Sequence, residues 1–283
     1  MLQALIHEAR LAAVALQFLT RVPVRLQRFD AQWLQDSARH FPLIGTAVGA
    51  FGAAALLAAL WAWPPWVAVL LAMAATVWLT GGFHEDGLAD TCDALGGAVL
   101  RARALEIMKD SRLGSYAALG LGLTLALKAA VLVALVGSLG AAGTAGALLL
   151  AHGLSRGATV ALLAALPYGG DVAHAKAKPL AQQISPAGLV VALGWCAALV
   201  LGLYLLGLSW PGLAGFTPLR LGAAVAAAAL VAWLCGRWLL RRLGGYTGDG
   251  LGATQQWCEL AVYLALAAYP AEVVAAVAVA AHA

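Results

Sequence analysis

The side chains best suited to chemistry lie in one short acidic stretch, residues 81–93 (GGFHEDGLADTCD). If residues 86–95 are helical, Asp86, Asp90 and Asp93 are spaced i, i+4 and i+7 and share one helix face. Three carboxylates on one face repel one another unless a cation lies among them. Oxygen ligands of this kind suit Mg²⁺, usually as a bridge to substrate phosphates. We therefore predict a Mg²⁺ site here rather than a solvated helix start.

The acidic residues are concentrated around this stretch and not spread over the chain. Of the 13 acidic residues, six fall between positions 85 and 110: Glu85, Asp86, Asp90, Asp93, Glu106 and Asp110. His84 precedes the cluster, and we expect it to act as a general base or to bind phosphate; the alternative is a structural histidine. The sequence has no Walker A motif and no G-x-G-x-x-G dinucleotide fingerprint.

A second stretch, residues 244–251 (GGYTGDGL), resembles residues 81–88 (GGFHEDGL), with five of eight positions identical. If the two are copies related by an axis near the membrane normal, as in parallel repeats, Asp249 and Asp86 would share one site. Chance similarity in a chain rich in Gly and Leu is the competing explanation. Helix packing that holds Asp86 and Asp249 apart would exclude the repeat.

Basic residues follow the acidic cluster in the sequence KDSRLGS, residues 109–115. Lys109 and Arg112 flank Asp110, and the planar fork of arginine suits a pyrophosphate. We predict phosphate binding by Lys109 and Arg112. For Arg101 and Arg103 we prefer ordinary anchoring at the cytoplasmic face.

Lys128 and Arg156 lie inside apolar segments, where a charge needs a partner or a water-filled cavity. Arg156 is about one helical turn or less from His152 and Ser155, so we expect these three to line one polar cleft and Arg156 to bind substrate. Lys128 could instead form a structural pair with a carboxylate.

The composition is that of an integral membrane protein. Of the 283 residues, 63% are hydrophobic and 11% are charged, against about 25% charged in soluble domains. The net charge of +4 is too small to indicate a nucleic-acid partner. The four cysteines lie far apart, without a disulfide framework or metal-ligand spacing.

We predict an all-α, polytopic membrane helix bundle, formed as a single integral membrane domain over residues 1–283. About seven apolar segments approach the ~20 residues that a span requires: 43–63, 65–82, 116–137, 141–166, 188–209, 219–240 and 259–280. An amphipathic helix precedes them within a cytoplasmic or interfacial segment, residues 1–42. Residues 83–115 are expected to form a cytoplasmic active-site loop, and residues 241–258 a second motif loop.

The distribution of basic residues supports this topology. With a cytoplasmic N-terminus, 14 of the 17 basic residues fall on the inside, Lys176 and Lys178 among them. The expected outer connections, near residues 64, 138–140 and 210–218, contain none. The acidic cluster is then predicted to face the cytoplasm.

Four motifs together resemble the cobalamin synthase family, adenosylcobinamide-GDP ribazoletransferase. They occur in order as residues 41–45 (FPLIG), 84–93 (HEDGLADTCD), 107–114 (IMKDSRLG) and 248–253 (GDGLGA). The resemblance extends from about residue 10 to residue 260. One departure is Ala94, where family members usually have Gly.

The resemblance implies the last condensation of cobalamin biosynthesis, at the bacterial inner membrane and dependent on Mg²⁺. Adenosylcobinamide-GDP and α-ribazole, or its 5′-phosphate, give adenosylcobalamin, or its 5′-phosphate, and GMP. On this interpretation Asp86, Asp90 and Asp93 hold Mg²⁺ on the pyrophosphate, and Asp249 or Asp110 completes the site. Cationic side chains offset the phosphate charge, and His84 or a carboxylate accepts the hydroxyl proton. The residues do not choose between a monomer, a homo-oligomer and a complex with other pathway enzymes.

Three other classes compete. A CDP-alcohol phosphotransferase also uses an Asp-Gly motif with metal, but its pattern continues Ala-Arg, where this chain has Ala89-Asp90. An aromatic prenyltransferase has a different Asp spacing and an apolar substrate. A transporter would place carboxylates at mid-membrane, whereas most carboxylates here are expected at the ends of spans.

Overall fold

The computed structural model describes residues 2–25, 30–97, 99–170 and 184–268. This part of the chain is helical, apart from turns and one isolated β-bridge between Tyr168 and Tyr246. The predicted all-α bundle is thereby confirmed. Lys176, Lys178 and the end of the predicted span 259–280 lie outside the described residues.

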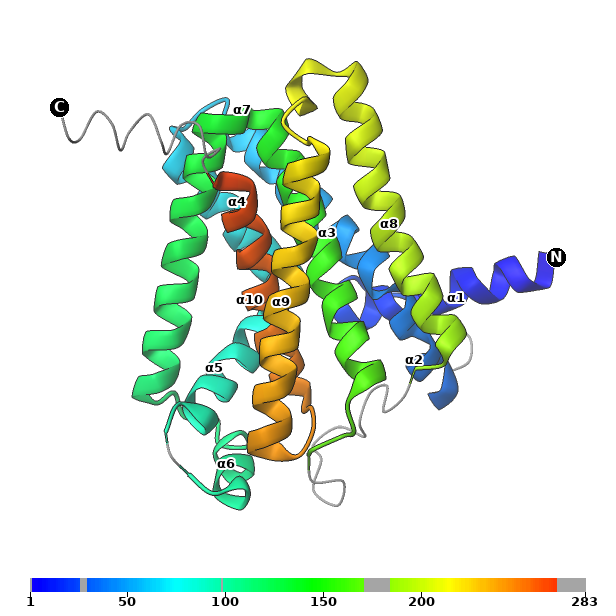
Figure 1. Cartoon of the computed structure of the whole chain (residues 1–283), viewed down its shortest axis with the longest axis vertical. Coiled ribbons are helices and arrows are strands. Elements are labelled where there is room, and N and C mark those ends of the chain that lie inside the picture. Colours follow the sequence, from blue (N-terminus) through cyan, green and yellow to red (C-terminus); the bar gives the residue numbers. More distant parts are fainter. Residues whose placement is uncertain (1, 26–29, 98, 171–183, 269–283) are drawn as a thin grey trace.

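The long helices stand side by side in one bundle (Figure 1). The helices are α1 (Leu2–Leu19), α2 (Ala31–Ser37), α3 (Phe41–Ala59), α4 (Pro65–Thr80), α5 (Phe83–Gly96), α6 (Arg101–Ile107), α7 (Ser115–Ala165), α8 (Pro186–Ser209), α9 (Pro218–Leu243) and α10 (Gly248–Ala267), with short 3₁₀ turns at Ala38–His40 and Pro211–Leu213. Helix α10 packs against α5, α7 and α9, while α3 packs against α4 and α7.

Local sequence signals set many of the helix ends. Proline stands in the first turn of α3, α4, α8 and α9, where its missing N–H costs nothing. Side-chain oxygens of Ser185, Thr217 and Thr247 accept backbone N–H bonds at the starts of α8, α9 and α10. Helices α4 and α9 end at Gly81 and Gly244, both in the left-handed conformation that glycine adopts most easily.

Helix α7 consists of two arms joined at Gly140. This glycine has φ 71° and ψ 179°, a conformation essentially restricted to glycine. Figure 1 shows the chain reversing direction at the top of the bundle, with one green arm rising and the other descending. The break lies where the predicted spans 116–137 and 141–166 meet.

Four helices of the described chain are long and apolar enough to cross a membrane, or five if the bent pair α4–α5 counts as one span. Helix α7 enters that count once, despite its two arms. The chain is a multi-pass membrane protein, and the exact figure of seven spans stays a prediction. Exposed tryptophans at the α3–α4 and α8–α9 connections, Trp61, Trp63, Trp66 and Trp210, are typical of a membrane–water interface.

Helix α1 lies across the direction of the long helices and extends to one side of the bundle (Figure 1). Its buried side consists of Leu11, Val14, Ala15 and Leu19. Glu8 ties it to the start of α3 through Arg39, at 3.0 Å, and His40, at 2.9 Å. This matches the predicted amphipathic helix.

Two of the predicted loops are largely helical. Residues 83–115 contain α5 and α6, and residues 241–258 contain the end of α9 and more than half of α10. Helix α10 begins at Gly248, not at the predicted residue 259. Its first turns carry Thr254, Gln255 and Gln256, whose buried polar side chains lower the hydropathy of the segment without preventing burial.

Candidate active site

The acidic cluster lies on α5, which begins after a sharp break. Gly81 and Gly82 both have positive φ, 74° and 71°, and α5 leaves α4 at an angle of 90°. Figure 1 shows α5 running obliquely towards the lower end of the bundle. Asp86 is exposed on this helix, and Asp90 and Asp93 are partly buried. The helical spacing on which the predicted shared face depends is therefore present.

Asp249 lies in the first turn of α10, beside α5. A Cβ added to Gly87 would stand 3.0 Å from the carbonyl oxygen of Asp249 and 3.1 Å from its Cα. A Cβ added to Gly252 would stand 3.4 Å from both the carbonyl oxygen of His84 and the Cα of Gly87. The two Asp-Gly motifs are thus in backbone contact, as the repeat hypothesis required.

The local structure of the two motifs is also similar. In each, a helix ends at a glycine with positive φ, Gly81 or Gly244, and the next helix carries an acidic residue in its first turn. Negative charge is favoured there by the helix dipole.

Asp93 has a structural partner. Its carboxylate accepts the backbone N–H of Gly114 at 2.6 Å and that of Ala117 at 2.8 Å. These donors belong to the N-terminus of α7, so Asp93 caps this helix from α5. Both carboxylate oxygens accept these bonds, and this contact between distant segments could not be predicted from local sequence.

No group of three or more His, Cys, Asp or Glu side chains in the described part of the chain is arranged to hold a metal ion. The predicted set Asp86, Asp90, Asp93 and Asp249 therefore does not form a preassembled metal cage. Mg²⁺ commonly binds through one or two carboxylates together with waters and substrate phosphates. The exposed carboxylate of Asp86, with Asp249 on the adjoining helix, fits that incomplete kind of site.

The predicted phosphate-binding residues lie between α6 and α7. The Arg112 side chain is 86% exposed and pairs with Asp110 through both guanidinium edge nitrogens. Its hydrogen bonds lower the pKa of Asp110 to about 2, so Asp110 is a carboxylate at neutral pH. Lys109 is partly buried. Because its side chain is exposed, Arg112 is accessible to a ligand from the aqueous side.

Arg101 and Arg242 donate hydrogen bonds to backbone carbonyls at and near the ends of neighbouring helices. Arg101 donates to the carbonyl oxygens of Leu243 and Gly169, both at 2.7 Å. Arg242 donates to those of Leu95, at 3.0 Å, and Gly97, at 2.7 Å. Each arginine thus binds at least one carbonyl at a helix C-terminus, Arg101 at α9 and Arg242 at α5, where a cation is favourable.

Arg156 lies deep in the bundle. Only 2% of it is exposed, and its guanidinium contacts the ring nitrogen and backbone carbonyl of His152 and, at 3.8 Å, the carboxylate of Glu259. His152 and Ser155 lie beside it, as predicted. In this conformation the three form part of a closed network and do not line an open cleft, and the Arg156 Nε atom has no hydrogen-bond partner.

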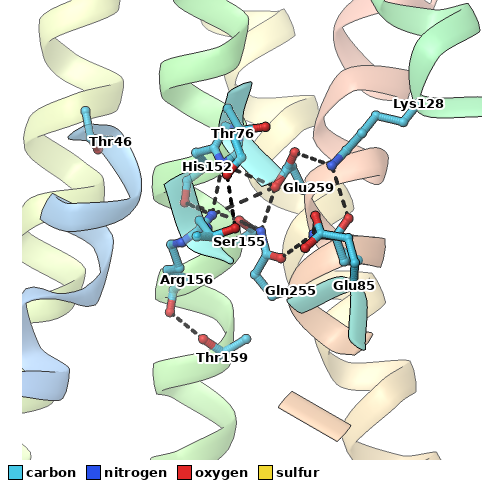
Figure 2. Close-up of polar contacts among 12 residues, drawn as sticks. Thr46, Thr76, Glu85, Lys128, His152, Ser155, Arg156, Thr159, Gln255 and Glu259 are labelled. Atoms are coloured by element: carbon cyan, nitrogen blue, oxygen red, sulfur yellow. Dashed lines mark hydrogen bonds and ion pairs between the residues drawn. The ribbon is translucent and has the colours of Figure 1, made fainter. Parts of the chain in front are cut away.

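Glu259 is the centre of this network (Figure 2). Its carboxylate is 2.7 Å from the Lys128 ammonium, which is the structural pairing considered for that lysine. Gln255 donates to it at 2.6 Å and Tyr263 at 3.2 Å. Glu259 thus joins α10 to both arms of α7.

A chain of amides extends the network to α5. Gln255 donates to Ser155 at 3.0 Å, and Gln256 donates to Gln255 at 2.9 Å and to the Glu85 carboxylate at 3.0 Å. Lys128 donates to Gln256 at 3.1 Å. The second oxygen of Glu85 is buried and has no hydrogen-bond partner. Glu85 directly precedes Asp86, so the network reaches the acidic motif.

His84 faces the interior. It is 5% exposed, and its ring packs edge-on against Phe83. Asp86, two residues further along α5, is exposed, because helix positions two apart do not face the same way.

Sequence reasoning did not single out Glu259, Gln255 or Gln256. The placement of the last span from residue 259 onward assigned the two glutamines to a loop. The available signal was the buried charge of Lys128, which demanded an acidic partner that the sequence alone could not identify.

Fold and site together define an all-helical, multi-pass membrane enzyme with two carboxylate-bearing motifs on adjoining helices. The family model described as cobalamin-5-phosphate synthase matches residues 11–267. The chain belongs to this family.

Named relatives agree with this assignment. A protein named adenosylcobinamide-GDP ribazoletransferase from Leptothrix cholodnii is 57% identical over 262 residues, covering 92% of this chain and 96% of the relative. Relatives of the same name from Polaromonas naphthalenivorans and Vibrio cholerae are 44% and 37% identical, each over at least 90% of both chains. No solved structure matches the chain.

Proposed function

We propose that the chain joins adenosylcobinamide-GDP to α-ribazole, or to its 5′-phosphate, releasing GMP and forming adenosylcobalamin, or its 5′-phosphate. The relatives carry the name of this activity. The structural observation that supports it most directly is the backbone contact between Gly87 and Asp249, which brings the Asp86 and Asp249 motifs together.

In this reaction the 3′-hydroxyl oxygen of the ribazole attacks the phosphorus bonded to the aminopropanol arm of cobinamide. A new P–O bond forms, the bond between that phosphorus and the bridging diphosphate oxygen breaks, and GMP departs with the bridging oxygen. The hydroxyl proton passes to a base. The leaving group carries developing negative charge, which nearby cations stabilise.

We assign phosphate binding to the segment between α6 and α7. Arg112 is exposed there and presents a planar, always charged fork that fits phosphate oxygens. Binding a diphosphate would require Arg112 to exchange its contact with Asp110 for the ligand. Lys109, three residues earlier, would add a second cation. We propose that Arg156 supports phosphate binding only indirectly, because its contacts lie inside the helix bundle.

We propose Asp86 and Asp249 as the protein ligands of Mg²⁺, with Asp90 on the same face of α5 as Asp86. When bound between these carboxylates and the diphosphate, Mg²⁺ would supply charge neutralisation and orientation of the phosphates. Asp93 is assigned to capping α7. Because Asp86 is exposed and His84 is buried, the proton acceptor is placed among the carboxylates on the aqueous side.

The proposed setting is the cytoplasmic side of a bacterial inner membrane, with the α5–α6 region facing the soluble substrates. The test is release of GMP from adenosylcobinamide-GDP by purified protein in liposomes, with α-ribazole and Mg²⁺. Release that requires both α-ribazole and a divalent ion is expected. No GMP above an Asp86→Asn, Asp249→Asn double variant would overturn the proposal.

A further inference from the structure

The buried network holds three charged side chains inside the helix bundle. Lys128, Arg156 and Glu259 are all at most 5% exposed, and each charge is costly to bury without a partner. None of the three touches the aqueous face where the phosphate chemistry is proposed. Their role therefore calls for a separate explanation.

The contacts of Glu259 with several helices suggest such an explanation. Glu259 contacts Lys128 on the first arm of α7 and Arg156 and His152 on the second arm. Through Gln256 the same network binds Glu85 on α5. Two residues of α10 thereby fix its position relative to three other helical segments (Figure 2).

The segments tied together are those that carry the aspartates. Glu85 directly precedes Asp86. Asp249 lies ten residues before Glu259 on the same helix, about 15 Å along its axis at 1.5 Å per residue. A shift of α10 would therefore move Asp249 past Asp86. Contacts between apolar side chains change little in energy when one helix slides slightly along another, so apolar packing alone would resist this shift weakly. Hydrogen bonds between charged groups are lost on the same displacement and therefore hold the helix in one position.

We propose that Glu259 is a positioning residue, which together with Lys128 and Gln256 sets the register of α10 against α5 and so the separation of Asp249 from Asp86. This deepens the proposed function and, for its activity readout, rests on it. The register itself is a structural property that can be measured without any substrate.

Charge-neutral replacement separates positioning from simple stability. Glu259→Gln alone leaves Lys128 buried without its anion, and that variant could fail to fold. The double variant Lys128→Met, Glu259→Gln removes one charge of each sign and leaves Arg156 and Glu85 to balance each other. Thr144→Val is the matched control, because Thr144 is fully buried and hydrogen-bonded to the Gly140 carbonyl at 2.8 Å outside this network.

The first measurement is the distance between spin labels at Phe83→Cys on α5 and Gly248→Cys on α10. Phe83 is 43% exposed, and a Cβ at Gly248 meets open space. Cys196 is replaced by Ala, since the other three native thiols are buried. A single narrow distance distribution is expected in the otherwise unaltered chain and in Thr144→Val, and a shifted or broadened one in the double variant.

The second measurement is turnover at saturating substrate in the variants without labels. The double variant should lose at least about tenfold in kcat while its thermal midpoint remains close to that of Thr144→Val. A folded double variant with an unchanged distance distribution would overturn the positioning role, whatever its activity. An altered distribution with no GMP release in any protein, including the unaltered chain, would instead overturn the proposed function and leave the positioning role supported.

Discussion

Gly87 and Asp249, 162 positions apart in the chain, lie in backbone contact. The point where a Gly87 Cβ would lie is 3.0 Å from the Asp249 carbonyl oxygen. That distance is closer than a side chain normally tolerates, and the neighbour is backbone, which cannot rotate away. The backbone of the second Asp-Gly motif therefore packs directly against Gly87.

Gly87→Ala should separate the two motifs. Overpacking of this kind costs about 1–3 kcal/mol, and we expect a thermal midpoint lower by several degrees together with a loss of turnover larger than the loss of folded protein explains. Turnover per folded molecule and the thermal midpoint in detergent are the measurements. Gly122→Ala is the control, because its Cβ meets nothing within 4 Å, and the change should lie within about 1 kcal/mol. Full activity in Gly87→Ala would show that the contact does not matter for catalysis.

Asp86→Asn should nearly abolish GMP release and leave the fold intact. The side chain is exposed, so removing its charge disturbs no buried contact, whereas a metal ligand or base depends on that charge. Glu106→Gln is the matched change, since Glu106 is 66% exposed and pairs with Arg103 in the same helix. Activity of Asp86→Asn near that of Glu106→Gln at ordinary Mg²⁺ concentrations would exclude Asp86 as a ligand.

Much of the architecture could be predicted because it follows from local signals. Hydropathy located α3, α4, α8 and α9 closely, and the break at Gly140 falls where the two halves of α7 were expected to meet. The start of α10 was wrong by eleven residues, 248 against 259. A hydropathy window scores Gln255 and Gln256 as polar, although each is buried and satisfied by partners on other helices.

The site divides in the same way. Helical spacing placed Asp86, Asp90 and Asp93 correctly along α5, but the capping of α7 by Asp93 depends on a tertiary contact. The need of Lys128 for a partner could be stated from its apolar surroundings. The identity of this partner, Glu259, could not be stated, because it depends on how α10 packs between the two arms of α7.

Arg112→Ala should raise KM for adenosylcobinamide-GDP by about tenfold or more, with little change in the thermal midpoint. The side chain is 86% exposed and supports no buried contact, while the loss of one charge-assisted phosphate contact is worth about 1.5–3 kcal/mol. Arg103→Ala is the control, being 65% exposed on the preceding helix. Equal KM values for the two variants would remove Arg112 from the substrate site.

Acid should release Arg112 from Asp110. The guanidinium lowers the pKa of Asp110 from 3.8 to about 2, so the ion pair is fully formed above about pH 4 and is lost as the pH falls towards 2. Titration of the Asp110 carboxyl by NMR in the unliganded protein measures this directly. In Arg112→Ala the same carboxyl should titrate near 3.8, and an unshifted Asp110 in the unaltered chain would contradict the pairing.

Asp93 offers the sharpest choice between the predicted metal ligand and the observed helix cap. Asn accepts backbone N–H bonds at a helix N-terminus about as well as Asp, whereas Ala loses about 1 kcal/mol there. If Asp93 acts as the cap of α7, Asp93→Asn should keep most of the thermal stability and turnover, and Asp93→Ala should lower the thermal midpoint, through the N–H groups of Gly114 and Ala117 left without their acceptor. If Asp93 instead binds Mg²⁺, Asp93→Asn would be stable and inactive and would need more Mg²⁺ for half-maximal rate. Measuring the thermal midpoint and the Mg²⁺ dependence of GMP release on both variants distinguishes the two, because the cap depends on an acceptor oxygen and the metal on a negative charge.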